Sequence, residues 1–252
     1  MAQMIDLTLP WSVETPSWPY FPNPQAEAFH RHPREGLNSL IVKTAMHTGT
    51  HLDAPLHLDP GGWDLARIPL EMLWGPAVAV DVSQDVGVHG VITPEIVQRR
   101  LPEPLRPGDR LLVHTGWHRY AWCGPEANET TYFAAHPGPS HALVDWLLEQ
   151  GVEWIGVDTP AWEHPLNTAI RDMRPDQVAE FERVHGRSLE SEYPREKLLY
   201  SHKRVAAKNK LLVECLGEGL AEVTGRRFVA GAFPWRFVRG EASICRVVAW
   251  ID

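Results

Sequence analysis

The sequence predicts a single α/β domain over residues 1–252, with a mixed sheet and flanking helices. Short apolar runs rich in β-branched residues recur along the chain between turn-forming or charged residues, which is typical of strands. Helical patterns alternate with these runs, as expected for an α/β domain. The chain shows no internal repeat and no linker, and its length is ample for one substantial hydrophobic core.

The predicted strands are apolar segments of the length that is usual in globular proteins. In chain order they comprise residues 40–45, 77–82, 110–114, 154–157, 211–215 and 244–251. Two helices are predicted between them. Residues 93–100 form the shorter helix, and residues 140–150 form the longer one, with Ser140 as its cap and Gly151 after its last residue.

Two segments depart from this pattern. Residues 165–199 are polar and have helical rather than strand character, so we expect an inserted segment that serves as a lid or an oligomer contact. The N-terminal segment is irregular and rich in aromatic residues and proline: Trp11, Pro16, Trp18, Pro19, Pro22 and Pro24. A wrap over the core and a wall of a substrate pocket are both consistent with that composition.

Composition narrows the class of protein. Hydrophobic residues make up 44% of the chain and charged residues 22%, which is the balance of a folded soluble protein. The net charge of -8 argues against nucleic acid or an anionic membrane as a partner, so we expect a small-molecule ligand. The lack of a long apolar run and of a secretory signal predicts a cytoplasmic location. The cysteines lack the close spacing of a zinc site or a disulfide framework.

The most informative segment runs from His47 to His57 and reads His-Thr-Gly-Thr-His-Leu-Asp-Ala-Pro-Leu-His. Imidazole nitrogen and carboxylate oxygen suit zinc and similar divalent ions, and a catalytic site needs about three protein ligands and one open position. His47, His51 and Asp53 supply three such ligands. Since the chain has 13 histidines, a histidine without function is the alternative at any one position, but the complete set indicates a metal site.

The spacing of this motif also predicts its backbone path. The candidate ligands occupy odd positions, so an extended chain would project them to one face and the apolar even positions to the core. A straight strand would nevertheless separate His47 from Asp53 by about 20 Å, which is too far for one ion. We therefore expect a strand that ends near Met46, a bend at Gly49, and a tight loop that carries the ligands.

A further candidate ligand lies far downstream. Glu214 interrupts the apolar run 211–215, and a buried carboxylate is costly unless it is paired or bound to a metal. The alternative is an edge strand whose glutamate faces water. His202 lies in a short helical pattern just before this run.

Together these segments resemble the metal-dependent cyclase family, which includes bacterial kynurenine formamidases and isatin hydrolases. The complete pattern His-x-Gly-Thr-His-x-Asp-x-Pro-x-His is the family hallmark, and family-like blocks follow at residues 108–117, 156–160, 202–214 and 228–248. The resemblance covers most of the chain in the same order. It implies the swivelling β/β/α fold of that family and a homo-oligomer, either a dimer or a tetramer.

The resemblance also implies roles for individual residues. A divalent metal, zinc or manganese, would be held as one or two ions per chain. The first position would be formed by His47, His51 and Asp53, and the second by Asp53, His202 and Glu214.

Two further residues receive roles from the same resemblance. His57 would be the proton-transfer residue, because an imidazole titrates near neutral pH, and a further metal ligand is the alternative. Trp18 would line the substrate pocket, as in formamidase relatives.

The expected activity is hydrolysis of an amide C–N bond by metal-activated water. The expected substrate is an aryl formamide resembling N-formylkynurenine or a cyclic amide resembling isatin, although residues 165–199 depart from the shorter link of kynurenine formamidases. A lactone or ester hydrolase, or a cyclase of secondary metabolism, would use the same metal site. A non-catalytic metal-binding relative is disfavoured, because His57 and every candidate ligand are present.

Overall fold

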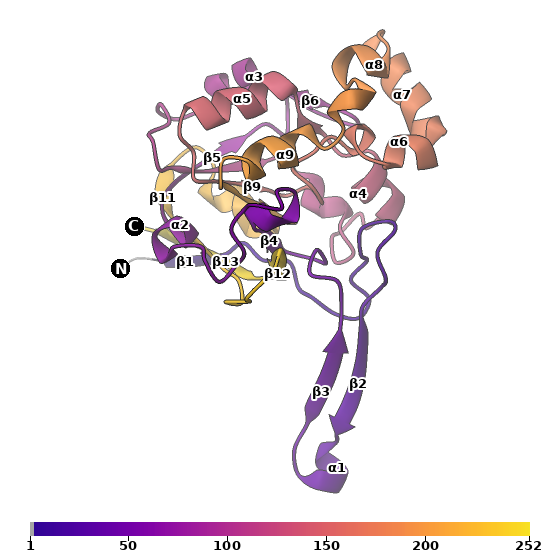
Figure 1. Cartoon of the computed structure of the whole chain (residues 1–252), viewed down its shortest axis with the longest axis vertical. Coiled ribbons are helices and arrows are strands. Elements are labelled where there is room, and N and C mark those ends of the chain that lie inside the picture. The colour runs from indigo at the N-terminus through magenta and orange to yellow at the C-terminus, as the bar shows by residue number, and fades with distance from the viewer. Residues whose placement is uncertain (1–2) are drawn as a thin grey trace.

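A nine-stranded mixed sheet organises the computed structural model, which describes residues 3–252 (Figure 1). Its strands, in spatial order, are β1 (Gln3–Asp6), β13 (Arg246–Ile251), β11 (Arg227–Phe233), β5 (Trp74–Asp81), β7 (Arg110–His114), β9 (Trp154–Val157), β10 (Leu211–Glu214), β4 (His51–Asp53) and β12 (Ala242–Ile244). The central strands β5, β7, β9 and β10 pair in parallel, and the other pairs are antiparallel. The structure therefore confirms the predicted α/β class and the mixed sheet.

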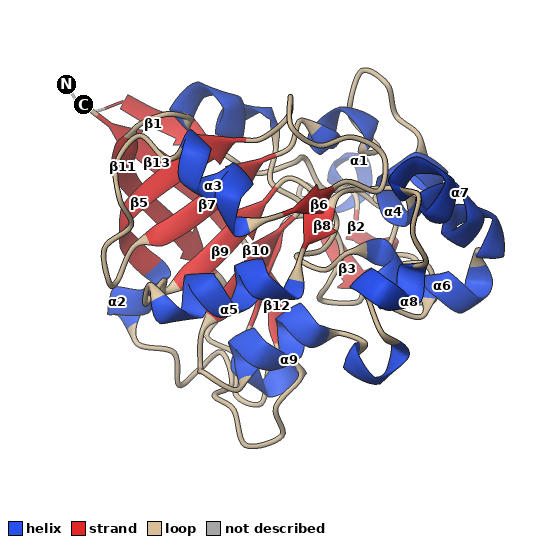
Figure 2. Ribbon diagram, turned by 90° about the horizontal axis from the view of Figure 1, so that it is seen from above, coloured by secondary structure: helices blue, strands red, loops and turns tan. Residues whose placement is uncertain are grey.

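The parallel strands are buried on both faces, as their continuous apolar sequences require. Every residue of β7 and β9 is buried. One face packs against the helices α3 (Pro94–Arg100), α5 (His141–Glu149) and α9 (Tyr200–Ala206), as Figure 2 shows. The predicted ends of α5 are confirmed, because Ser140 Oγ accepts a hydrogen bond from the Leu143 amide at 3.2 Å and Gly151 adopts a φ of 73°.

The sheet curls until its two ends meet. β12 and β13 lie at or next to opposite ends of the strand order, yet Cys245 alone separates them along the chain. The Cys245 amide donates a hydrogen bond to the Thr50 carbonyl at 3.1 Å, and the Leu7 amide donates one to the Val247 carbonyl at 2.9 Å. The single strand predicted over residues 244–251 is therefore two strands, because the chain changes its pairing partners at Cys245.

A β-hairpin projects from the body of the molecule (Figure 1). It consists of β2 (Gln25–His30) and β3 (Ser39–Lys43), with the short helix α1 (His32–Glu35) between them. Leu40, Ile41 and Val42 on β3 are exposed. The strand predicted over residues 40–45 is present, but it ends at Lys43 rather than near Met46 and lies outside the main sheet.

Residues 165–199 form the helical segment that the sequence predicts. Its elements are the 3₁₀ helix η3 (Pro165–Asn167), α6 (Ile170–Met173), α7 (Pro175–His185), α8 (Leu189–Glu192) and the 3₁₀ helix η4 (Arg195–Lys197). They enclose a small apolar core around Phe181 and Tyr193, to which Ala134 of α4 (Glu129–Ala134) contributes.

The remaining elements are short. They are η1 (Pro55–His57), α2 (Leu70–Leu73), β6 (Val91–Ile92), η2 (Trp117–Tyr120), β8 (Gly138–Pro139) and η5 (Glu218–Val223). Among residues 3–252, none of the helices combines the length and the apolar character needed to cross a bilayer.

Candidate metal centre

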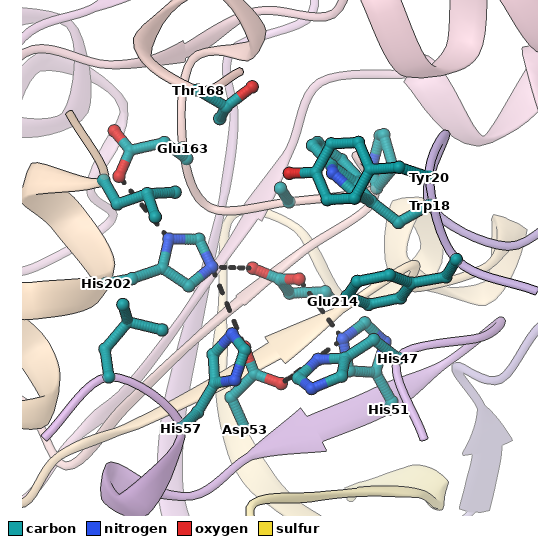
Figure 3. A pocket seen from close by; sticks show the side chains of 15 residues that line it. Trp18, Tyr20, His47, His51, Asp53, His57, Glu163, Thr168, His202 and Glu214 are labelled. Atoms are coloured by element: carbon teal, nitrogen blue, oxygen red, sulfur yellow. Dashed lines mark hydrogen bonds and ion pairs between the residues drawn. The ribbon is translucent and has the colours of Figure 1, made fainter. Parts of the chain in front are cut away.

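The predicted ligands meet beside β4 and β10 (Figure 3). His51 and Asp53 lie two positions apart on β4, so their side chains leave the same face of the strand. Glu214 on β10 pairs in register with His51. His202 comes from α9, and His47 comes from the segment just before β4. The structure therefore brings residues from distant parts of the sequence into one cluster.

The bend predicted at Gly49 is present, with a φ of 72° that favours glycine. A Cβ atom at this position would lie 3.0 Å from Cδ1 of Trp11. The predicted ligand-bearing loop is wrong in part, because His51 and Asp53 lie on a strand that pairs with β10 on one side and β12 on the other. Pairing on both sides holds these two side chains more rigidly than a loop would.

The candidate ligand atoms lie at the separations expected around a small cation. Nδ1 of His47 is 2.9 Å from Oδ1 of Asp53, and Nε2 of His51 is 3.4 Å from the same oxygen. Nε2 of His202 lies 3.7 Å from Oδ2 of Asp53 and 3.2 Å from Oε1 of Glu214. Ligands of a tetrahedral ion at about 2.0–2.2 Å lie roughly 3.3–3.6 Å from one another. The separations in the cluster, from 2.9 to 3.7 Å, bracket this range, so the residues lie close enough to share a small cation.

Several of these atoms are buried without a hydrogen-bond partner. Both carboxylate oxygens of Asp53, Nε2 of His47 and Nε2 of His51 are in this state. Buried polar groups in folded proteins are nearly always satisfied, and an unpaired carboxylate is especially costly. Nε2 of His47 lies 3.4 Å from Oε1 of Glu241. A divalent cation would satisfy the Asp53 oxygens and Nε2 of His51 at once, so these residues fit a bound metal ion.

The carboxylates of the cluster are ionised. Burial disfavours the charge on Asp53, but the neighbouring His47 holds its pKa well below the usual value. Burial and the Asp53 carboxylate likewise disfavour the charge on Glu214, yet contacts with His202 and His51 keep the Glu214 pKa at about 2. Two negative charges therefore face the same small space, which favours a cation between them.

The histidines of the cluster supply positive charge when no ion does. Burial lowers the pKa of His47, but Asp53 reverses this effect and raises it to about 8. Burial also lowers the pKa of His202, and Glu163 and Glu214 more than offset it, so that the pKa reaches about 10. A divalent ion that bound these histidines would displace their protons, and its own positive charge would replace theirs. Metal binding to histidine releases protons in general.

His57 stands beside the cluster and carries no charge at neutral pH. Burial lowers its pKa to about 4, against the attraction of Asp53. Its ring centroid lies 4.2 Å from that of His47, and one of its nitrogens is within 4.8 Å of donor atoms of His47 and Asp53. A neutral imidazole can accept a proton or bind a metal ion, so the position suits both predicted roles.

The sequence analysis missed Glu163, which is fully buried behind His202. Its Oε2 accepts a hydrogen bond from the Ser201 amide at 2.9 Å and lies 3.5 Å from Nδ1 of His202. Its Oε1 accepts a hydrogen bond from Nδ2 of Asn167 at 3.0 Å. A carboxylate behind a histidine ligand fixes the orientation of the ring. The only signal in the sequence is a glutamate directly after the apolar Trp162.

A cavity of about 200 Å³ lies over the cluster, and aromatic side chains line one side of it (Figure 3). Trp18 lines the cavity, and its ring packs edge-on against Phe133 with the centroids 5.9 Å apart. Tyr20 and Phe21, which the sequence analysis did not single out, complete the aromatic side. The N-terminal segment therefore packs on the body and also lines the cavity, and its role as a wall of a substrate pocket stays a prediction.

The helical segment 165–199 also reaches this cavity. Thr168 and Leu199 contribute to its lining. The Leu199 amide donates a hydrogen bond to the Asn167 carbonyl at 2.9 Å, which ties the two ends of the segment together next to the cavity. The segment therefore takes part in shaping the space above the metal cluster.

Comparison with known proteins gives one family and a set of similar folds. The model of the Cyclase family, described as "Putative cyclase", matches residues 5–164. Isatin hydrolase A from Labrenzia aggregata, bound to benzyl benzoate, is 22% identical with a TM-score of 0.77, and the match covers 99% of this chain and 94% of that chain. Isatin hydrolase A from Ralstonia solanacearum is 23% identical with a TM-score of 0.77, over 100% and 92% of the two chains.

A predicted metal-dependent hydrolase from Bacillus stearothermophilus is 21% identical with a TM-score of 0.68, over 99% of this chain and 98% of that chain. At these identities the likeness shows a shared fold. The fold that the sequence predicts is therefore confirmed along almost the whole chain.

Proposed function

This chain belongs to the Cyclase family, and from that membership and the cluster beside β4 we propose that it is a metal-dependent hydrolase of amide C–N bonds. The observation that carries the proposal is the set of buried, unsatisfied histidine and carboxylate atoms beneath an aromatic cavity. Chemistry at such a site depends on a bound divalent ion, and the metal-dependent description of a protein with the same fold supports this choice.

The proposed metal ligands are two histidines and a carboxylate from the first motif and two residues from the later part of the chain. They are His47, His51, Asp53, His202 and Glu214. Zinc or manganese is the proposed ion, since imidazole and carboxylate suit both. When bound, such an ion lowers the pKa of water to roughly 7 and polarises a carbonyl oxygen.

Asp53 is placed to serve two metal positions. Its Oδ1 faces His47 and His51, while its Oδ2 faces His202. Glu214 also divides its oxygens, with Oε2 3.3 Å from His51 and Oε1 3.2 Å from His202. This arrangement supports the proposal that the chain holds one or two ions.

His57 is the proposed proton carrier. As a neutral imidazole beside the cluster, it can take a proton at its unprotonated nitrogen and pass the proton to the leaving nitrogen of an amide. Its place in η1, directly after the ligand strand, keeps it next to the ligands without strand pairing of its own. Glu163 is proposed to position His202 through the contact at Nδ1.

The proposed substrate is an aryl formamide resembling N-formylkynurenine or a cyclic amide resembling isatin. Trp18, Tyr20 and Phe21 offer planar apolar surface beside the candidate ligands, which suits an aromatic or cyclic amide. Isatin hydrolases share the fold, which supports the cyclic amide. The cavity of about 200 Å³ has room for a small substrate.

We also propose that the chain forms a homo-oligomer. A hairpin that stands apart from the main sheet is marginally stable on its own. On its strand β3, Leu40 is 65% exposed and Ile41 is 56% exposed, which is unusual for neighbouring apolar residues. Packing of this hairpin against a second copy of the chain would cover these side chains.

Activity measurements on metal-reconstituted protein test the proposed function. Chelator-treated chain, with and without added Zn²⁺ or Mn²⁺, is assayed against aryl formamides, isatin-like cyclic amides, lactones and esters. We expect hydrolysis of a formamide or a cyclic amide that is lost on chelation and restored by metal. An unchanged rate after chelation would contradict the metallohydrolase, and activity confined to lactones or esters would contradict the C–N specificity.

A further inference from the structure

Histidine and carboxylate side chains also meet at the carboxyl ends of β7 and β9, outside the lining of the cavity already described. His114 ends β7, Asp158 follows β9, and His118 lies on η2. We call these three residues the second cluster. Parallel strands bring their carboxyl ends to one edge of a sheet, where ligands of α/β proteins commonly bind.

The donor atoms of the second cluster converge. One atom from each of His114, His118 and Asp158 lies within 4.8 Å of the other two. Nδ1 of His118 is 3.2 Å and Nε2 of His114 is 3.9 Å from the same oxygen, Oδ2 of Asp158. Ligands about 2.0–2.1 Å from a divalent ion lie roughly 2.9–4.2 Å apart, depending on the coordination geometry. The second cluster therefore has the dimensions of a metal site.

Asp158 is held rigidly by its surroundings. It is fully buried, and its Oδ1 accepts hydrogen bonds from the Thr115 amide at 2.9 Å and the Thr115 hydroxyl at 2.6 Å. Its Oδ2 accepts a hydrogen bond from the Trp117 amide at 3.1 Å. Burial disfavours its charge, but the nearby His118 and His114 keep the Asp158 pKa below the usual value. An ionised and fixed carboxylate oxygen therefore faces both histidines.

His114 is oriented as a metal ligand would be. Its Nδ1 donates a hydrogen bond to Oδ1 of Asp81, at the end of β5, over 3.2 Å, which leaves Nε2 as the nitrogen that can face a metal ion. His114 is only 8% exposed, and its Nε2 is buried without a hydrogen-bond partner. Metal-bound histidines commonly donate their other N–H to a carboxylate in this way. A purely structural hydrogen-bond network around Asp158 would leave this nitrogen unsatisfied.

We propose that His114, His118 and Asp158 bind a divalent first-row transition metal ion of the zinc type. Two imidazoles and one carboxylate suit such an ion and leave a position for water. His118 provides the open side, because it lines a surface cavity of about 300 Å³ together with Cys123 and Glu218. The ion would tie the ends of β7 and β9 to η2, and this binding does not depend on the proposed hydrolase activity.

Zinc stoichiometry of the whole chain tests the second cluster. Chelator-treated protein is titrated with Zn²⁺, and the zinc that remains after removal of free ion is counted by elemental analysis. The H51A/D53A double variant, which disables the centre beside β4, should retain one zinc ion per chain. Adding His118→Asn, which keeps an N–H group near Asp158, should remove that ion or weaken its binding at least 10-fold. Equal zinc binding with and without this substitution would overturn the proposal.

A control variant and a measurement on the wild-type protein complete the test. His32→Asn, in the exposed helix at the tip of the hairpin (Figure 1), removes a histidine far from both clusters and should leave the stoichiometry unchanged. Wild-type protein with ¹⁵N-labelled histidine needs no substitution, and saturating Zn²⁺ should shift the ring nitrogen signals of His114 and His118. If both signals stay in place at saturation, the second cluster binds no zinc.

Discussion

Glu214 on β10 lies directly opposite His51 on β4, and its Oε2 is 3.3 Å from Nε2 of His51. Side chains opposite each other on neighbouring strands have their Cβ atoms about 4.5–5.5 Å apart, so strand register sets this separation. A slip of one residue in either strand would turn that strand's side chain to the other face of the sheet and separate the pair. The geometry of the candidate metal centre is therefore a property of the sheet rather than of a flexible loop.

Replacing His51 or Asp53 by Ala should remove bound metal. Each substitution takes away buried ligand atoms without a hydrogen-bond partner, either Nε2 of His51 or the carboxylate oxygens of Asp53. We expect a loss of at least one ion per chain in elemental analysis, with an unchanged far-UV circular dichroism spectrum. Full retention of metal in both variants would show that the ligand assignment is wrong.

His57→Ala should keep the metal and lose most of the turnover. General acid–base groups contribute roughly 100- to 10,000-fold to rate, so we expect a fall in kcat of that order. Metal content and kcat are measured on the same preparation. If metal is lost together with activity, His57 is a ligand instead.

Glu163→Gln should weaken metal binding without removing it. Substitutions behind a histidine ligand typically cost 10- to 100-fold in metal affinity, because the ring is no longer held in orientation. Competition with a coloured chelator measures the affinity. Glu196→Gln, an exposed position in η4, is the matched control and should bind metal like the wild type. An unchanged affinity in Glu163→Gln would exclude the positioning role.

The protein should lose stability in acid through its buried neutral histidines. Burial lowers the pKa of His136 to about 4 from its ordinary value of 6.5, and burial also lowers the pKa of His164. The unfolded chain takes up a proton at His136 near pH 6.5, while the folded chain does so only near pH 4. Stability is therefore fully present above pH 6.5 and falls as the pH drops toward 4, by about 3 kcal/mol for His136.

Urea unfolding at pH 7.5 and pH 5 checks this dependence. The His136→Gln variant cannot take up the proton, so its free energy of unfolding should change less between the two pH values. His32→Gln, at an exposed position, should keep the wild-type dependence. An equal dependence in all three proteins would show that His136 does not contribute.

The proposed oligomer should depend on the hairpin. Light scattering coupled to size exclusion should give a dimer or a tetramer for the wild type, and a smaller species for Leu40→Glu combined with Ile41→Glu. Val238→Glu places the same charge at another exposed apolar position and should leave the mass unchanged. A monomeric wild type would contradict the proposal.

The spacing of residues in the first motif predicts those features of the site that depend only on the local backbone. The shared face of His51 and Asp53 follows from their separation along a strand, and the bend at Gly49 follows from the need to bring His47 back. The position of Glu214 follows from the cost of burying a carboxylate in an apolar run. These inferences need only the chemistry of a few neighbouring residues.

Other features of the site depend on contacts between residues that are distant in the sequence, and the pattern of a single sequence does not reveal such contacts. Glu163 meets the Ser201 amide 38 residues later in the chain, and nothing near Glu163 indicates this partner. The apolar run on β3 carries the same signal as a core strand, although its side chains are exposed. The position of Tyr20 and Phe21 beside the cavity likewise depends on how the N-terminal segment packs on the body.

The pairing of β4 has a consequence for the synthesis of the protein. This strand belongs to the first quarter of the chain, but both of its partners, β10 and β12, belong to the last. Pairings between such distant segments carry a high entropic cost and form slowly. On the ribosome, the strand of the first motif can therefore pair with β10 only after Glu214 has emerged, and with β12 only after Ile244 has emerged. The metal centre that is encoded first is among the last parts of the fold to be completed.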